Sequence, residues 1–311
     1  MRLVFAGSPD VAVPTLKALH GAGHEVALVI TQPDAKGRRG GELHPTAVSV
    51  AARELGLDVF TPARASDPEA VARVRAVDAD IAAVVAYGQI LKPDLLGAVR
   101  GGWVNLHFSL LPAWRGAAPV QRALMAGDDF TGASTFVLEE GLDTGPVIGT
   151  LTEEIRATDT AGDLLARLGD AGAQLMIASL EAMVAGRALP IPQSADGVSL
   201  APKLTRADAL VNWELPALAV DRRIRACTPA PGGWSTLPDG TTVRLGPVRI
   251  RPSLPPTVPG QLSFTDGEVR VGTGTSPVAL TTVQPAGKRE SDAAAWWRGA
   301  RLPEGAQLGE A

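Results

Sequence analysis

The sequence has few of the residues that form disulfides or metal clusters. It contains one cysteine, Cys227, among 311 residues, so no disulfide can form within the chain and no set of cysteine ligands can hold a metal ion. The four histidines are scattered, and His20 and His24 have no obvious third ligand. The sequence therefore predicts no metal site.

Long hydrophobic runs are also missing. No apolar run reaches the roughly 18 residues that a membrane-spanning helix requires. The first apolar run ends at Gly7-Ser8-Pro9, too early for a signal peptide. Hydrophobic residues make up 45% of the chain and charged residues 20%, which is typical of globular proteins. We therefore expect a cytoplasmic protein without a membrane partner.

The chain has no excess of positive charge. The net charge is −4, which disfavours general binding to nucleic acid. The charge is uneven, because residues 1–189 carry 16 basic and 22 acidic side chains (net −6), whereas residues 190–311 carry 13 and 11 (net +2). An RNA partner would therefore need local clusters of lysine and arginine.

The N-terminal stretch lacks the glycine pattern of dinucleotide-binding sites. Leu3–Ala6 and Val26–Ile30 predict buried strands on either side of a helix over Val11–His20, which is the opening of a parallel sheet with a right-handed crossover. The first turn reads Gly7-Ser8-Pro9-Asp10 in place of Gly-x-Gly-x-x-Gly, so a dinucleotide cofactor is disfavoured.

The alternation of strands and helices continues to residue 189. The predicted strands are Val59–Pro62, Ile81–Ala86, Trp103–Phe108, Ala133–Leu138 and Val147–Ile155, and the predicted helices are Pro45–Leu55, Asp67–Arg75, Ala118–Met125 and Thr160–Val184. We therefore expect an α/β fold, with an open, Rossmann-like, parallel-rich sheet in an N-terminal domain of residues 1–189.

A linker and a second domain are expected after residue 189. Residues 190–206 begin with a proline-rich run that predicts a linker. After a helix over Pro216–Ala226, glycine and proline separate the short predicted strands Thr242–Leu245, Val248–Arg251, Gly260–Phe264, Glu268–Gly272 and Val278–Thr282. This pattern predicts a small OB-like β-barrel over residues 207–311.

The most informative stretch runs from Trp103 to Pro119. Its first residues alternate, so Asn105 and His107 lie on one face of a strand. Pro112 cannot continue a strand ladder, which places both side chains at the carboxyl end of the strand, where open α/β sheets bind ligands. A single asparagine at such a place is ordinarily a turn residue, and a single histidine ordinarily has only a structural role. For the pair, followed by a Pro- and Gly-rich loop, a functional site and a structural role are equally well supported.

Two further segments have both a structural and a functional interpretation. Asp143 lies in a sharp loop between Gly141 and Gly145, where an aspartate either forms the turn or reaches the imidazole as a charge partner. The segment Gln32–Gly41 is either a solvated surface loop or a loop that binds phosphates and bases through its cations, which are Lys36, Arg38 and Arg39.

Three separated motifs resemble the signature of the folate-dependent formyltransferases. They are Asn105-x-His107, Ser109-Leu110-Leu111-Pro112-x-Trp114-Arg115-Gly116-Ala117-Ala118-Pro119, and Asp143-Thr144-Gly145. The resemblance covers nearly the whole chain and is greatest to the branch that acts on methionyl initiator tRNA. It implies transfer of the formyl group of 10-formyltetrahydrofolate to the α-amino group of methionyl initiator tRNA, for translation initiation.

The resemblance also implies roles for single residues. Asn105 would donate a hydrogen bond to the developing oxyanion, and His107 would act as an acid/base or as a second electrophilic group. Asp143 would hold and tune His107 or relay a proton through water. Arg115 would either orient the methionyl end of the acceptor or only pair structurally. The implied folate-binding residues are Gly88, Gln89, Ile90, Leu91, Ser109, Leu110, Leu111 and Pro112.

Basic residues from both domains are the tRNA contacts that the resemblance implies. They are Lys36, Arg38 and Arg39, in a loop that would enter the acceptor stem, and Lys203, Arg206 and Lys288. Two positions depart from the family pattern: Ser49 stands where a lysine is frequent, and Arg289-Glu290-Ser291 follows Lys288 where a methionine is usual. We expect the protein to act as a monomer.

Other functions stay open at this point. A formyltransferase for amino sugar nucleotides would use the same Asn105, His107 and Asp143 but would not need the basic loop or the C-terminal motifs. A hydrolase of formyltetrahydrofolate would use water in place of the amine. A tRNA- or RNA-binding module without catalysis would need none of the three residues.

Overall fold

The computed structural model describes residues 1–36, 42–303 and 305–309. Contacts group the chain into two compact units. Unit 1 comprises Met1–Pro119, Phe130–Glu154 and Leu165–Ala201, and unit 2 comprises Val120–Asp129, Ile155–Leu164 and Pro202–Ala311. The domain boundaries expected from the sequence, 1–189, 190–206 and 207–311, stay a prediction.

Unit 1 is built on one seven-stranded sheet. Its strands are β1 (Arg2–Gly7), β2 (Glu25–Ile30), β5 (Val59–Phe60), β6 (Ile81–Val85), β7 (Trp103–His107), β8 (Phe130–Val137) and β9 (Val147–Glu154). They lie in the order β5-β2-β1-β6-β7-β8-β9; β8 is antiparallel to both of its neighbours, β7 and β9, and the remaining neighbours are parallel. The parallel-rich, Rossmann-like sheet predicted from the sequence is confirmed.

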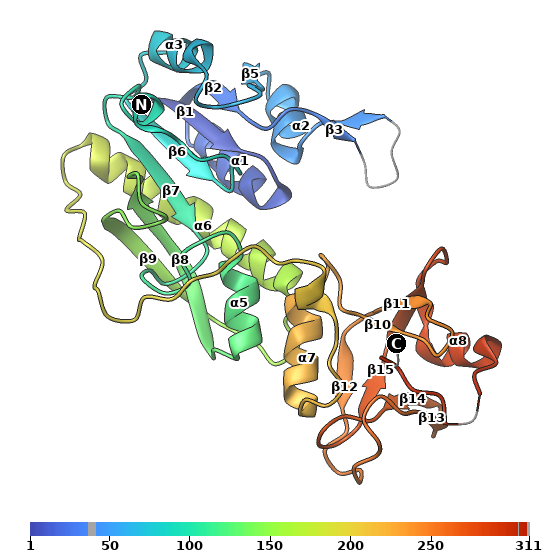
Figure 1. Ribbon diagram of the computed structural model, residues 1–311. Helices are drawn as coiled ribbons and strands as arrows, with labels where there is room; N and C mark the ends of the chain where they lie inside the picture. The colour runs from blue at the N-terminus through green and yellow to red at the C-terminus, as the bar shows by residue number, and fades with distance from the viewer. Residues whose placement is uncertain (37–41, 304, 310–311) are drawn as a thin grey trace. The chain divides into compact units, whose positions relative to one another are not determined.

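Helices flank this sheet (Figure 1). Those of unit 1 are α1 (Val13–Gly21), α2 (Ala47–Glu54), α3 (Pro68–Ala76), α4 (Pro93–Leu96) and the part of α6 (Ala161–Val184) from Leu165 on, whereas α5 (Pro119–Ala126) belongs to unit 2 from Val120 on. Val74 of α3 and Leu95 of α4 are buried in one cluster with Val4 and Val84 of the sheet. On β7, Leu106 contacts α6 at Gly172, where a Cβ atom would lie 2.8 Å from the leucine side chain. Apolar residues on alternate positions therefore bury both faces of the sheet.

Two helices begin later than the sequence predicts. A single 3-10 turn, η1 (Asp10–Ala12), precedes α1, so the predicted start at Val11 is two residues early. Helix α2 begins at Ala47 because Thr46 is its N-cap, and the Thr46 hydroxyl accepts a hydrogen bond of 3.0 Å from the Ser49 N–H. Both differences in the starting residue come from the local structure at the helix N-terminus, which hydrophobic periodicity does not predict.

The segment predicted as a basic loop contains a short hairpin. Strand β3 (Ala35–Lys36) pairs antiparallel with β4 (Leu43–His44). Lys36 therefore belongs to a strand. Arg38 and Arg39 lie outside the described residues.

Unit 2 contains mainly short antiparallel strands. Its elements are η2 (Ala207–Ala209), α7 (Ala217–Ala226), β10 (Trp234–Thr236), β11 (Thr242–Leu245), β12 (Val248–Ile250), β13 (Leu262–Thr265), β14 (Glu268–Val271), β15 (Val278–Leu280), β16 (Thr282–Pro285), β17 (Ser291–Asp292) and α8 (Ala293–Ala300). The strands form two sheets, β10-β11-β16-β17 and β12-β15-β14-β13. Val243, Val271 and Val278 are buried in their common core. The two sheets and their common core form a small barrel-like domain, as the sequence predicts.

The sequence analysis predicted no element at four places in unit 2. These are η2, β10, β17 and α8, the last of which is capped by Asp292 through a 2.9 Å hydrogen bond from the Ala295 N–H. The predicted strand Val278–Thr282 covers β15 and ends at Thr282, the first residue of β16, so most of β16 was not predicted. Among the described residues, no helix has the length and hydropathy needed to cross a membrane.

Candidate active site

The predicted catalytic residues lie at the carboxyl edge of the unit 1 sheet. Asn105 is paired in register with Val84, and β7 ends at His107, one residue beyond its pairing of Leu106 with Val85. The loop that follows β6 therefore lies next to the carboxyl end of β7. Parallel neighbours bring these two loops to one edge, as the sequence predicts.

The loop after β7 is fixed by buried hydroxyl groups. The Ser109 hydroxyl donates to the Ala113 carbonyl at 2.6 Å, and the Ser134 hydroxyl donates to the Ser109 carbonyl at 2.7 Å. The Leu111 N–H in turn donates to the Ser134 hydroxyl at 3.1 Å, and the bond from Leu111 to Pro112 is cis. This part of the predicted folate-binding stretch is therefore tied to β8.

His107 is buried and its tautomer follows from its partner. Its Nε2 lies 2.8 Å from the Trp114 carbonyl oxygen, and a carbonyl only accepts, so Nε2 carries the proton. Trp114 has a φ of 59°, in the left-handed region that L residues rarely adopt. In the neutral ring Nδ1 is therefore the nitrogen with a free lone pair, able to take up a proton.

Asp143 faces that second nitrogen. Its Oδ2 lies 3.7 Å from His107 Nδ1 and accepts a 2.7 Å hydrogen bond from the Gly116 N–H. Burial lowers the pKa of His107 below its ordinary value, while the Asp143 charge and the Trp114 carbonyl act in the opposite direction. The ring is therefore held mainly neutral near pH 7, with a carboxylate placed to stabilise it once protonated.

Asn105 presents its carboxamide at the same edge. Its side chain is half-buried, and no hydrogen bond joins it to another described side chain. Asp143 adopts a φ of 51°, so the sharp turn expected between Gly141 and Gly145 is present. The structure thus brings His107 and Asp143 into contact and puts Asn105 two residues from His107 on the strand.

The second predicted folate-binding loop, Gly88 to Leu91, is only partly exposed. Ile90 is 84% exposed, whereas Leu91 is buried in the sheet core. The Gln89 carboxamide accepts a 2.7 Å hydrogen bond from the Ala65 N–H, so it is occupied within the fold. Ile90 is therefore the side chain of this loop that is best placed to meet an apolar ligand.

The predicted tRNA contacts of unit 2 are exposed cations. Arg206 lies 4.6 Å from the Trp234 ring centroid and donates to the Thr242 hydroxyl at 3.4 Å. The Thr242 carbonyl accepts from the Ala286 N–H at 2.8 Å, in the turn that leads to Lys288. Arg206 and the turn of Lys288 therefore flank the same residue, and Lys203 precedes Arg206 by three positions.

No pattern in the sequence indicated the backbone groups that orient the side chains of His107 and Asp143. The Trp114 carbonyl binds His107 and the Gly116 N–H binds Asp143. A sequence motif shows which side chains are present but not where such backbone groups point. Gln193, inside the predicted linker, contacts the carbonyls of Asp143 and Gly145. Arg115 donates two hydrogen bonds to the Gln193 carboxamide, and its expected role at the methionyl end of the acceptor stays a prediction.

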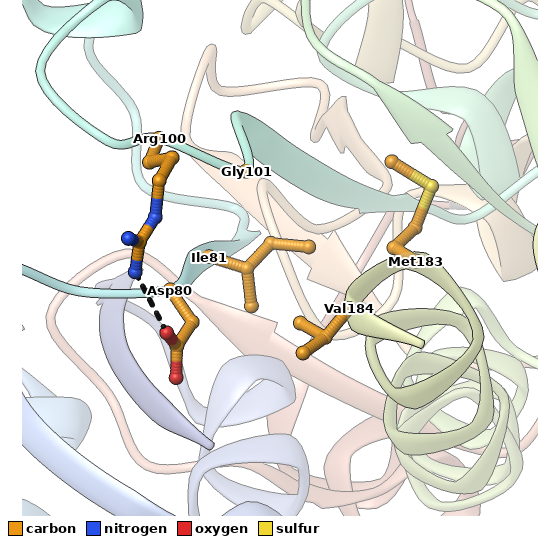
Figure 2. A pocket seen from close by; sticks show the side chains of 6 residues that line it. All are labelled: Asp80, Ile81, Arg100, Gly101, Met183 and Val184. Atoms are coloured by element: carbon orange, nitrogen blue, oxygen red, sulfur yellow. Dashed lines mark hydrogen bonds and ion pairs between the residues drawn. The ribbon is translucent and has the colours of Figure 1, made fainter. Parts of the chain in front are cut away.

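A separate cavity lies at the other end of β6. It has a volume of about 350 Å³ and is lined by Asp80, Ile81, Arg100, Gly101, Met183 and Val184 (Figure 2). Figure 2 shows the Arg100 side chain directed to Asp80, with which it forms an ion pair of 3.0 Å. This cavity lies at the amino-terminal end of β6, and none of the predicted site residues lines it. No group of three or more potential metal ligands occurs in the part of the chain described.

An open sheet with a carboxamide, an imidazole and a carboxylate at its carboxyl edge is the architecture of an α/β enzyme. The chain belongs to the formyl transferase family: residues 1–180 match the formyl transferase domain and residues 203–301 match the formyl transferase C-terminal domain.

Relatives over the full length are similar to this chain. A protein of Thermobifida fusca named methionyl-tRNA formyltransferase is 53% identical over 310 residues, covering 100% of both chains. One of Salinispora tropica with the same name is 54% identical over 308 residues, covering 99% of this chain and 100% of the other. The whole length, including unit 2, therefore contributes to the likeness.

A solved structure shares the fold. The structure of HypX from Aquifex aeolicus in complex with tetrahydrofolic acid has a TM-score of 0.68 at 17% identity. The match covers 95% of this chain and 46% of the HypX chain, so this chain spans less than half of HypX. At this identity the likeness shows a shared fold.

Proposed function

We propose that this enzyme transfers the formyl group of 10-formyltetrahydrofolate to the α-amino group of methionyl initiator tRNA. The observation that carries the proposal is the identity of 53–54% to relatives named methionyl-tRNA formyltransferase over essentially the full length of both chains. The match includes the C-terminal domain, residues 203–301. The product, N-formylmethionyl-tRNA, serves translation initiation, so we place the enzyme in the cytoplasm, acting as a monomer.

The folate donor is proposed to bind between the loops that follow β6 and β7. Exposed Ile90 offers an apolar surface to the pteridine ring, with Gly88, Gln89 and Leu91 shaping the loop. Ser109, Leu110, Leu111 and Pro112 form the facing wall, where the hydroxyl hydrogen bonds keep the backbone fixed. A rigid wall limits the conformational entropy that binding would otherwise cost.

Asn105 is proposed to stabilise the oxyanion. When the amine attacks the formyl carbon, the carbonyl oxygen gains negative charge. The half-buried carboxamide can donate an N–H to it without losing a bond to another described side chain. A fixed donor in a partly desolvated site stabilises the charge more than water does.

His107 and Asp143 are proposed to move the proton. The lone pair of Nδ1 accepts the proton that the attacking amine loses, and the Asp143 carboxylate stabilises the imidazolium that results. The same proton then passes to the folate nitrogen as its bond to the formyl carbon breaks. One N–C bond forms, one breaks, and the net proton transfer is from amine to folate nitrogen.

The acceptor tRNA is proposed to contact cations of both units. In unit 2 these are Lys203, Arg206 and Lys288, all exposed. In unit 1, Lys36, Arg38 and Arg39 are proposed to reach the acceptor stem. Arginine suits bidentate contacts with phosphate and base edges, and lysine supplies a point charge.

The proposal is tested by following labelled formyl groups. The purified enzyme is given 10-formyltetrahydrofolate labelled in the formyl group, together with methionyl initiator tRNA, an amino sugar nucleotide and water as competing acceptors. Label in N-formylmethionyl-tRNA alone supports the proposal. Label in the sugar nucleotide, or release of formate without an acceptor, would refute the proposed acceptor.

A further inference from the structure

The segment between the two units in the chain is bonded to the loops of the site. We call residues 190–201 the crossing segment; it passes β9 and β8 after α6 (Figure 1). Ile191 and Val147 exchange two backbone hydrogen bonds of 2.8 Å. Further along, the Arg115 N–H donates to the Ser199 carbonyl at 2.9 Å, and the Ala201 N–H donates to the Arg115 carbonyl at 2.7 Å. The crossing segment is therefore part of the wall of unit 1.

Gln193 is the side chain of the crossing segment that reaches the Asp143 loop. Its Nε2 donates to the carbonyls of Asp143 and Gly145, both at 2.8 Å. Its Oε1 accepts from Arg115 Nε at 3.0 Å and Nη2 at 2.7 Å. Carbonyls only accept and a guanidinium only donates, so these four bonds fix the orientation of the carboxamide.

The Asp143 loop is held at its end, where Gly145 is buried and the Val137 N–H donates to the Pro146 carbonyl at 3.0 Å, but less so around Asp143. Its neighbours Leu142 and Thr144 are exposed, and Asp143 itself adopts the left-handed conformation. Loop residues with few buried contacts move easily unless hydrogen bonds restrain them. The Gln193 carboxamide restrains the backbone, and the Gly116 N–H restrains the carboxylate.

We propose that Gln193 is a positioning residue for formyl transfer, which holds the carboxylate of Asp143 beside Nδ1 of His107. The kinetic part of this inference rests on the proposed function, whereas the positional part does not. Arg115 completes the arrangement by filling the acceptor side of the Gln193 carboxamide. The motif arginine thus acts on the site through a residue of the predicted linker.

The position of Asp143 can be read from His107. Three influences set the pKa of this ring: burial lowers it, and the Asp143 charge and the Trp114 carbonyl raise it. If the carboxylate moves away from Nδ1, the raising effect weakens and the pKa falls further. Replacing glutamine by methionine keeps the length of the side chain, removes its hydrogen bonds and adds no charge.

The experiment compares Gln193→Met with a matched control, Gln174→Met, at an exposed position of α6. Histidine resonances, four in the chain, are titrated by NMR, and single-turnover formyl transfer is measured across pH. Gln193→Met should lower the pKa of His107 and slow transfer about 10- to 100-fold with little change in KM, because small misplacement of reacting groups is costly. The control should match wild type in both measurements.

Equal His107 pKa values and rates in Gln193→Met and wild type would overturn the inference. A second variant, Gln193→Glu, keeps the acceptor for Arg115 but loses the two donors; it should be as slow as Gln193→Met, and a wild-type rate would also overturn it. If the wild-type enzyme forms no N-formylmethionyl-tRNA, the proposed function fails, yet the titration still shows whether Gln193 holds Asp143.

Discussion

At the scale of single residues, opposing influences act on the pKa of His107. Burial favours the neutral ring, whereas Asp143, 3.7 Å from Nδ1, favours the imidazolium. A base that is neutral at working pH and gains a partner on protonation suits transfer from an amine. The Trp114 carbonyl fixes which nitrogen does this.

The pH dependence follows from these directions. Since the pKa of His107 is lowered from 6.5, the neutral base persists to lower pH, and the rate should fall only as pH drops through that lowered value. The acid limb of single-turnover transfer should therefore lie below pH 6.5. Asp143→Asn removes the charge that raises the pKa, so the limb should move further to acid and the plateau rate should fall about 10²-fold.

Two results would contradict this assignment. One is an acid limb above pH 6.5 in the wild-type enzyme. The other is an Asp143→Asn variant with an unchanged limb and plateau, measured with the same donor and acceptor concentrations. NMR titration of His107 in both proteins separates a change in the base from a change in a later step.

At the scale of elements, the loop after β7 depends on a glycine. Gly116 has a φ of 124°, and a Cβ atom there would lie 2.7 Å from the Ala201 carbonyl oxygen of the crossing segment. The backbone of the two segments can approach closely only because this side chain is absent. The same residue donates the N–H that binds Asp143.

Gly116→Ala should therefore lose both stability and activity. Backbone strain of this kind costs about 1–3 kcal/mol, to which the close contact with the carbonyl adds. Gly186→Ala is the matched control, since Gly186 also has a positive φ, 65°, but no atom within 4 Å of its Cβ position. Urea unfolding should show a larger loss for Gly116→Ala; equal losses would mean that the crossing segment yields to the methyl group.

The elements also show what a sequence can and cannot predict. Alternation in Trp103–Phe108 and the glycines around Asp143 predicted the strand and the turn, because both depend on neighbouring residues. The contact of Gln193 with Asp143 joins positions 50 residues apart and depends on tertiary packing. A proline-rich run predicts a linker whether or not the run packs against the rest of the protein. The contacts of Gln193 were therefore not predicted.

At the scale of the whole molecule, net charge differs between the two parts of the chain. Residues 190–311 carry a net positive charge and the exposed Lys203, Arg206 and Lys288, while residues 1–189, which include the proposed catalytic residues, are net negative. Arg206 is stacked on Trp234, so its charge is held in place, whereas Lys203 is an exposed cation. Phosphate contacts of this kind give affinity that falls with salt.

Lys203→Ala should weaken binding of methionyl initiator tRNA and reduce the slope of log affinity against log salt by about 1. Lys17→Ala, at an exposed lysine of α1, makes the same change at a position for which no tRNA contact is proposed, and it serves as control. Filter binding at several salt concentrations measures both slopes. Identical slopes for Lys203→Ala and wild type would remove Lys203 from the proposed interface.

The carboxamide of Asn105 is proposed to stabilise the transition state of formyl transfer to methionyl initiator tRNA. The most direct measurement is single-turnover transfer of labelled formyl groups by wild type and Asn105→Ala, with tRNA affinity measured on the same preparations. We predict a rate loss of about 10²–10³-fold with tRNA affinity unchanged. A rate within tenfold of wild type, or losses of rate and affinity in equal proportion, would contradict the account.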